Sequence, residues 1–209
     1  MGMKGWYDSH VMPRVITAAC GQKGIGKRRQ QVIPLARGRV FEIGCGGGLN
    51  QTLYDAELVT SFSGVDPNAK LLDGARERAS ARGWQVDIRQ GVGENVPFAD
   101  GSFDTVVCTY TLCSVKDPAR VLSEVRRILA PNGMLLFLEH GRAPDAAVAR
   151  WQQRIEPVWK PLAGGCHLTR SIGSSLRGAG FSVEPLGQSY LKKTPKVVGW
   201  MEWGVARKA

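Results

Sequence analysis

The stretch VFEIGCGGGLN, residues 40–50, places an acid just before three glycines at alternate positions: Glu42, then Gly44, Gly46 and Gly48. Glycine permits positive φ and close approach of a ligand to the backbone, so this spacing predicts a turn that holds a nucleotide-like ligand. A dinucleotide fingerprint needs its last glycine where Leu49 stands. A phosphate-binding P-loop needs a lysine that this loop lacks.

S-adenosylmethionine fits these residues better, because it carries no phosphate and therefore does not need the positive end of a helix. Its ammonium and sulfonium groups tolerate an acid before the turn, which is where Glu42 stands. Asp66 ends a predicted strand, and an acid there can accept hydrogen bonds from both ribose hydroxyls of a nucleotide. Because a dinucleotide and an adenosyl ligand share that ribose, Asp66 alone does not discriminate between them.

Four motifs occur in order along half of the chain, about residues 39–140: the E-x-G-x-G-x-G turn, GVDPN, GVGENVPFADGSFDTVV and PARVLSEVRRILAPNG. Together they resemble the class I S-adenosylmethionine-dependent methyltransferases, above all the small-molecule branch that includes ubiquinone and phospholipid methyltransferases. The resemblance implies S-adenosylmethionine as the methyl donor, S-adenosylhomocysteine as the product, and no metal.

The same resemblance implies a role for individual residues in binding the cofactor. Around its methionine portion we expect Glu42, Gly44, Cys45 and Gly46, with Thr109 closing that end. Asp66 would hold the ribose, and the adenine would lie beside Pro67, Asn68, Gly93 and Glu94. Many relatives carry an acid for the adenine amino group where this chain has Val92, so Glu94 or backbone carbonyls would make that contact here.

A second, narrower resemblance lies in LEHGRAPD and WQQRIEPVWKPLAGGCHLTR, which are similar to the mammalian microsomal alkyl-thiol methyltransferases. It implies a small, fairly apolar acceptor and thiol chemistry. Those relatives carry a hydrophobic N-terminal membrane anchor, and we expect none in this sequence, since no apolar run approaches the length that spans a bilayer.

Methyl transfer from a sulfonium is an in-line displacement, in which the protein mainly aligns the acceptor and excludes water. A base helps when the acceptor is a thiol and matters more for an oxygen acceptor. His140, at the end of a predicted strand, is the first candidate for this base, followed by His10 and Tyr7. His167 and Cys166 lack a third ligand at usable spacing, so no metal site is expected.

The elements that must position these residues alternate short apolar runs with helical stretches, the pattern of a parallel sheet with crossover helices. We expect strands at 39–44, 62–66, 86–90, 103–110, 133–140, 181–190 and 197–206. Helices are expected near 49–58, 68–82, 118–129, 144–162 and 169–179. This predicts an α/β, Rossmann-like, seven-stranded, mostly parallel sheet with helices on both faces and an antiparallel last strand. An N-terminal arm, 1–36, precedes the domain at 37–209, which contains a helical substrate-side insertion at 144–180.

The net charge of +10 comes partly from two basic clusters. They are Lys23, Lys27, Arg28 and Arg29, and then Lys192, Lys193 and Lys196. Both a solvated surface and contact with an anionic membrane explain them, and no nucleic acid is expected because no aromatic residues interleave with the first cluster. Five cysteines form no C-x-x-C pair, which favours a reducing cytoplasm, with peripheral membrane association open.

Three alternatives to a small-molecule methyltransferase follow from these observations. The first is a phosphatidylethanolamine N-methyltransferase, which would use the basic surface at anionic membranes. The second is a methyltransferase-like binding protein without turnover, although the intact glycine turn and Asp66 argue against it. A short-chain dehydrogenase is disfavoured, because no tyrosine has a lysine four residues further on.

Overall fold

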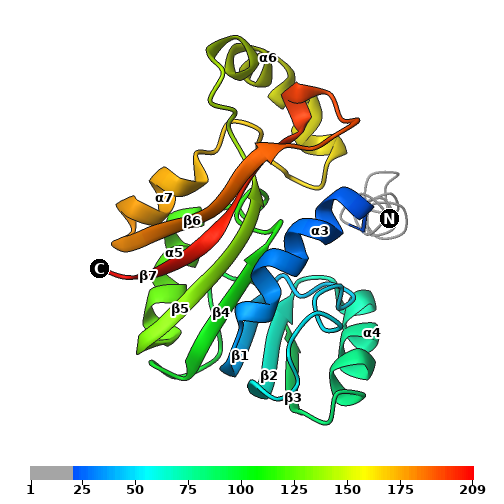
Figure 1. The fold of residues 1–209 in the computed structure, drawn as a ribbon, viewed down its shortest axis with the longest axis vertical. Coiled ribbons are helices and arrows are strands. Elements are labelled where there is room, and N and C mark those ends of the chain that lie inside the picture. The colour runs from blue at the N-terminus through cyan, green and yellow to red at the C-terminus, as the bar shows by residue number, and fades with distance from the viewer. Residues whose placement is uncertain (1–20) are drawn as a thin grey trace.

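The computed structural model describes residues 21–209, and Figure 1 shows their arrangement. Seven strands form one sheet in the order β3-β2-β1-β4-β5-β7-β6. The strands are β1 (Gly38–Ile43), β2 (Val59–Asp66), β3 (Gln85–Gln90), β4 (Phe103–Thr109), β5 (Leu129–His140), β6 (Phe181–Tyr190) and β7 (Trp200–Lys208). The first five pair in parallel, and β7 is antiparallel to both β5 and β6. The predicted fold class is confirmed.

Helices cover both faces of this sheet (Figure 1). The helices of the described residues are α3 (Lys23–Val32), α4 (Ala69–Ser80), α5 (Pro118–Ile128), α6 (Ala146–Leu162) and α7 (Ile172–Gly178), with short 3₁₀ turns η1 (Ile33–Leu35) and η2 (Lys196–Val198), and α6 lies beyond the end of the sheet instead of on a face. Apolar side chains of α3 and α4 share one buried cluster, and those of α5 and α7 share the other. None of the helices within residues 21–209 has the length and apolarity needed to cross a membrane.

Helix α5 shows how the local sequence produces these elements. Its apolar side chains recur at helical spacing and are buried on one face: Val121, Leu122, Val125 and Ile128. Asp117 caps the helix by accepting a hydrogen bond from the Arg120 N–H at 3.0 Å, and Pro118 occupies the first turn, where a missing N–H costs nothing. The predicted helix is therefore confirmed within one residue at its end.

The helix predicted near 49–58 is wrong, because the chain forms a series of turns there. The Leu53 N–H donates to the Asn50 carbonyl, and the Gln51 N–H donates to the Gly48 carbonyl. Both hydrogen bonds join residues three positions apart, as in turns. The Asn50 and Gln51 side chains are fully buried instead of facing solvent. Buried polar side chains need partners, and the turns direct Asn50 toward the inside of the protein, where it finds them.

The N-terminal arm contains α3, which packs on the face of the sheet formed by β5 and β7. Ile25, Arg29 and Val32 are buried along one side of it. The first basic cluster is therefore divided, since Lys23 and Lys27 are exposed while Arg29 points inward. The arm's other candidates, Tyr7 and His10, lie outside the described residues.

Candidate functional site

The glycine turn leaves β1 at the edge where the parallel strands end. Gly44 has φ +68 and donates its N–H to the Val65 carbonyl at 2.8 Å. A Cβ at this position would collide with the Thr111 hydroxyl, so glycine is required both by backbone conformation and by space. The turn is thereby locked against the loop that follows β4.

The next glycines of the turn face open space. A Cβ at Gly46 or Gly47 would meet no atom within 4 Å, so a ligand can approach the backbone closely there. The Gly46 N–H donates to Asp66 Oδ2 at 2.9 Å, and the Asn68 N–H donates to Oδ1 at 2.8 Å. Burial raises the pKa of Asp66, while these two N–H groups oppose the rise. Asp66 therefore joins the ends of β1 and β2 beside an open cradle suited to an adenosyl ligand.

Glu42 lies underneath the turn and is almost completely buried. Asn50 Nδ2 donates to its Oε1 at 2.6 Å, and the Tyr54 hydroxyl donates to its Oε2 at 2.9 Å. Burial raises the pKa of Glu42 to about 7, against the lowering effects of Tyr54, Arg29 and Asn50. Both carboxylate oxygens thus have protein partners, and Glu42 acts on the site through the side chains that it holds.

Arg29 reaches this cluster from α3 and was not predicted as a site residue. Its Nη1 donates to Thr109 Oγ1 at 3.1 Å and also to Asn50 Oδ1. The Arg29 Nε is buried and has no hydrogen-bond partner in the structure. A buried cation with an unused donor suits an anionic group, such as the carboxylate of an amino acid ligand. The spacing of Ile25, Arg29 and Val32 along one helix side is the signal that could have identified it.

The residues expected beside the adenine occupy neighbouring loops. Gly93 is buried against Ile43, where a Cβ would come too close. The Glu94 Oε1 accepts hydrogen bonds from the backbone N–H groups of Lys116 and Asp117, at 3.1 and 3.3 Å. Asn68 caps α4 by accepting from the Lys70 N–H at 3.1 Å, and Pro67 before it is exposed. Glu94 is thus engaged with the segment that precedes α5.

The loop after β4 is held by Glu139, a fully buried residue near the end of β5. Its carboxylate accepts from the N–H groups of Thr111 and Leu112 at 3.0 Å and of Cys113 at 3.1 Å. Burial raises its pKa to about 7 although these donors lower it. Three consecutive N–H groups fixed by one side chain give this loop a defined shape. The sequence motif LEH contains Glu139, but its spacing does not reveal this function.

His140 ends β5 and is buried, with its Nδ1 3.2 Å from Cys166 Sγ. Its Nε2 is buried without a hydrogen-bond partner in the part of the chain described. The segment carrying Cys166 folds onto the loop after β4, since the His167 N–H donates to the Cys113 carbonyl at 2.8 Å. The His167 side chain lies 2.9 Å from Glu156. The structure thus joins His140 to the predicted insertion.

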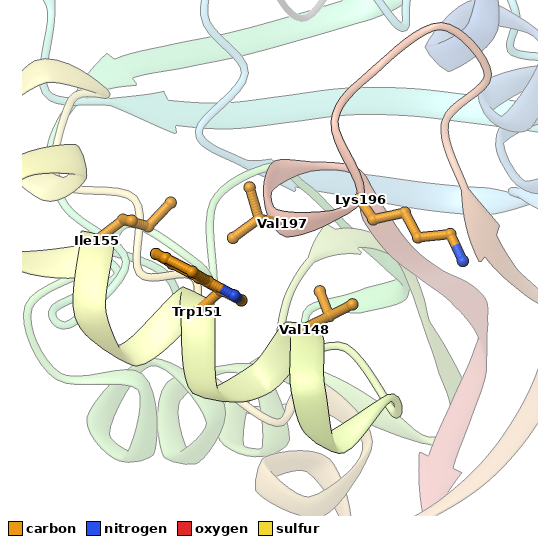
Figure 2. Close-up of a pocket in the computed structure, with 5 residues that line it drawn as sticks. All are labelled: Val148, Trp151, Ile155, Lys196 and Val197. Atoms are coloured by element: carbon orange, nitrogen blue, oxygen red, sulfur yellow. The ribbon is translucent and has the colours of Figure 1, made fainter.

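Helix α6 stands beyond the end of the sheet at which β5 finishes (Figure 1). A groove of about 330 Å³ lies between this helix and η2, and the residues that line it are Val148, Trp151, Ile155, Lys196 and Val197 (Figure 2). Trp151 is 57% exposed, so this side of α6 is more open to solvent than a core face would be. Trp159, about two turns further along the helix, is half-buried.

A mostly parallel sheet, a glycine turn after β1 and an acid at the end of β2 define a nucleotide-binding α/β protein of the Rossmann type. The chain matches the family described as "Methyltransferase domain" over residues 41–137. It is 37% identical over 203 residues to human thiol S-methyltransferase TMT1B, covering 91% of this chain and 80% of the human protein. The chain belongs to the class I S-adenosylmethionine-dependent methyltransferases.

Other relatives and structures agree with this assignment. Rat thiol S-methyltransferase TMT1B is 41% identical over 149 residues, which cover 68% of this chain and 59% of the rat protein. Phosphatidylethanolamine N-methyltransferase of Cereibacter sphaeroides is 33% identical over 124 residues, covering 57% and 60% respectively. In structure, the chain resembles a Thermotoga maritima protein titled "SAM-dependent methyltransferase, possible histamine N-methyltransferase", with a TM-score of 0.66, 22% identity and full coverage of both chains.

Proposed function

We propose that this protein transfers a methyl group from S-adenosylmethionine to a small apolar or amphipathic acceptor, with a thiol as the first choice. The observation that carries the proposal is the open glycine turn braced by Asp66, at the same edge of the sheet as a buried His140 whose Nε2 has no hydrogen-bond partner within residues 21–209. The similarity to two proteins named thiol S-methyltransferase supports sulfur as the acceptor atom.

Bound S-adenosylmethionine supplies a methyl group on a sulfonium, a carbon already activated for displacement. Asp66 would hold the ribose, and the backbone of Gly44, Cys45 and Gly46 would line the methionine portion with Thr109. Pro67, Asn68, Gly93 and Glu94 would lie near the adenine. In this proposal residues 37–209 form the transferring domain, and the arm at 1–36 contributes Arg29 to it.

His140 would accept the proton that a thiol loses on methylation. Its Nδ1 lies against the Cys166 sulfur, so Nε2 is the nitrogen left to meet an acceptor. Burial of a polar nitrogen without a hydrogen-bond partner destabilises the protein unless a ligand or water forms that hydrogen bond. A thiol is partly ionised near neutral pH, so the contribution of a base should be moderate, on the order of 10-fold to 100-fold.

The test is transfer of a labelled methyl group to a small alkyl thiol, with phosphatidylethanolamine vesicles assayed in parallel. Label on the thiol is expected for the wild type. His140→Gln should reduce turnover while leaving S-adenosylhomocysteine affinity within about 2-fold, and His167→Gln serves as the matched histidine control. Tight binding of S-adenosylhomocysteine with no label on any thiol would contradict the proposed acceptor class.

A second candidate, N-methylation of phosphatidylethanolamine at a membrane surface, is favoured by the outer side of α6. Val158 and Leu162 on this helix are 65% and 59% exposed, on the same side as Trp151. Exposed cations occur on α6 itself and on or just before η2, which lines the groove with it: Arg150, Arg154, Lys192, Lys193 and Lys196. Aromatic and aliphatic side chains flanked by cations suit the interface of an anionic bilayer. We propose a cytoplasmic protein that can bind a membrane peripherally through α6.

Sedimentation with vesicles tests this location directly. Vesicles containing phosphatidylserine should bind the wild-type protein in a salt-sensitive manner, and Leu162→Asp should weaken binding several-fold. Leu58→Asp is the matched control, because Leu58 is also exposed, at 48%, but lies before β2 rather than on α6. Equal binding by both variants, or none by the wild type, would exclude α6 as the membrane contact.

A further inference from the structure

Two cysteines far apart in the sequence meet beside His140. Cys113 belongs to the loop after β4, and Cys166 lies between α6 and α7. The hydrogen bond from the His167 N–H to the Cys113 carbonyl, 2.8 Å, brings the two backbones together. The Cys113 thiol is hydrogen-bonded to Cys166, and the Cys166 sulfur also lies 3.2 Å from His140 Nδ1. The three side chains therefore form one cluster.

The environment distinguishes the two sulfur atoms. The Cys113 thiol, through its hydrogen bond, and then His140 lower the pKa of Cys166 well below the ordinary value of a thiol, despite burial. The pKa of Cys113 is raised, first by this same contact and then by burial. The Arg170 guanidinium adds positive charge nearby, since its Nη1 donates to the Leu112 carbonyl at 2.6 Å. The contact with His140 Nδ1 and the lowered pKa both favour the thiolate form of Cys166, and the raised pKa of Cys113 favours its thiol form.

Solvent exposure, like the pKa, makes Cys166 the more reactive of the two cysteines. Cys166 is only partly buried, whereas Cys113 is almost completely covered. A small oxidant from solvent therefore meets Cys166 first, and a low-pKa, accessible cysteine next to a second cysteine is the arrangement that oxidises readily. The transfer reaction proposed above uses His140 but requires neither sulfur to react.

We propose that Cys113 and Cys166 form a redox-active pair, activated by His140, that hydrogen peroxide converts to an intramolecular disulfide. The Cys166 thiolate attacks one peroxide oxygen, the O–O bond breaks, and the hydroxide released takes a proton to become water. Cys166 is then a sulfenic acid, and the peroxide has been reduced. The Cys113 sulfur attacks the Cys166 sulfur, the S–O bond breaks, and the departing hydroxide leaves as water with the Cys113 proton.

The disulfide would fix the insertion to the loop after β4 and remove the thiolate that faces His140. If the proposed function is correct, oxidation should therefore inhibit methyl transfer, because the insertion is then bonded covalently to the loop after β4 and the contact between Cys166 and His140 Nδ1 changes. This regulatory consequence rests on the proposed function, whereas formation of the disulfide does not.

The experiment treats the full-length reduced protein with hydrogen peroxide and maps its peptides without reduction. A peptide pair joined through Cys113 and Cys166 is expected, and a thiol reductant should reverse it. Cys166→Ser should abolish the pair, and Cys113→Ser should stop at a sulfenic acid that dimedone traps. Cys108→Ser changes another buried cysteine and is the matched control. This variant should still form the disulfide between Cys113 and Cys166. His140→Gln should slow oxidation at least about 10-fold, by reducing the thiolate fraction.

Oxidation of other cysteines with Cys113 and Cys166 left as thiols would overturn the proposal, and so would over-oxidation of Cys166 without a disulfide. Activity separates the two inferences. If the disulfide forms and methyl transfer continues, the redox-active pair is supported and its proposed inhibition of the enzyme is excluded. A disulfide that forms in a protein inactive when fully reduced supports the pair and counts against the proposed function.

Discussion

Arg29 and Thr109 are joined by a hydrogen bond of 3.1 Å from guanidinium Nη1 to hydroxyl Oγ1, across 80 positions of the sequence. Arg29 belongs to the arm helix α3, and Thr109 ends the strand β4. The same guanidinium lies over the Tyr110 ring, 5.5 Å from its centroid. In the proposed site, the arm therefore places a buried cation next to Thr109, the residue expected to close the methionine end of the cofactor position.

Arg29→Met should weaken binding of S-adenosylhomocysteine by about 10-fold to 100-fold, since hydrogen bonds to a charged group contribute roughly 1.5–3 kcal/mol. Isothermal titration calorimetry measures the dissociation constant. Lys27→Met, an exposed cation on the same helix, is the matched control and should have no effect. Equal affinities for all three proteins would show that Arg29 supports the fold alone.

Asp66→Asn should reduce S-adenosylhomocysteine affinity at least about 10-fold. The amide has one oxygen, so it can no longer accept from both the Gly46 and Asn68 N–H groups, and its NH₂ opposes one of these donors. Asp73→Asn on α4 provides the control, because the Asp73 side chain is 90% exposed. An unchanged affinity in Asp66→Asn would exclude the braced turn as the cofactor site.

Gly44→Ala should lower the free energy of unfolding by at least about 2 kcal/mol, because alanine is strained at positive φ and its Cβ would collide with Thr111. Gly26→Ala should act in the opposite direction. Gly26 lies inside α3 with open space around its Cβ position, so alanine should stabilise by about 0.5–1 kcal/mol. Urea unfolding of both variants measures these changes, and equal midpoints would contradict the argument.

Glu42 should make the cofactor-free protein less stable as pH rises. Its pKa is raised from 4.5 to about 7 in the folded protein, so the folded state binds the proton more tightly than the unfolded chain. This contribution to stability is fully present below about pH 4.5 and is lost as pH rises through 7, with a size on the order of 3 kcal/mol. Glu139, with a pKa of about 7, acts in the same direction.

Urea unfolding of wild type and Glu42→Gln at pH 5 and pH 8 isolates this contribution. The fall in unfolding free energy between the two pH values should be smaller in the variant, because glutamine does not titrate. The other carboxyl groups are common to both proteins and cancel in the comparison. Parallel pH dependence would indicate that Glu42 has an ordinary pKa.

The sheet could be predicted from the sequence because each strand is a short apolar run and each crossover helix has its own period and cap, as α5 shows. The cradle followed from Gly44, Gly46 and Asp66, whose spacing along the chain reflects the turn itself. The stretch 49–58 misled this reasoning, since its residue types permit a helix while Asn50 and Tyr54 face inward to donate hydrogen bonds to the buried carboxyl group of Glu42.

The partners of Arg29 and Cys166 could not be predicted in this way, although the helical spacing of Arg29 indicates that it faces inward. Each residue contributes to the site through contact with a residue tens of positions away in the sequence. Arg29 contacts Thr109, and Cys166 contacts Cys113. No local period records such a contact. Their partners could be identified only when the sheet order had brought the ends of β1, β4 and β5 side by side.

The insertion leaves the sheet after β5 and returns at β6, while the residues around the glycine turn come from earlier in the chain, between Arg29 and Thr109. If the proposed function is correct, recognition of the methyl donor and recognition of the acceptor are thus encoded largely by separate, contiguous stretches of the gene. Mutation or exchange of the later stretch could give a descendant a new acceptor while the earlier one keeps its ligand. The junction between β5 and α6 is the natural point at which such lineages would diverge.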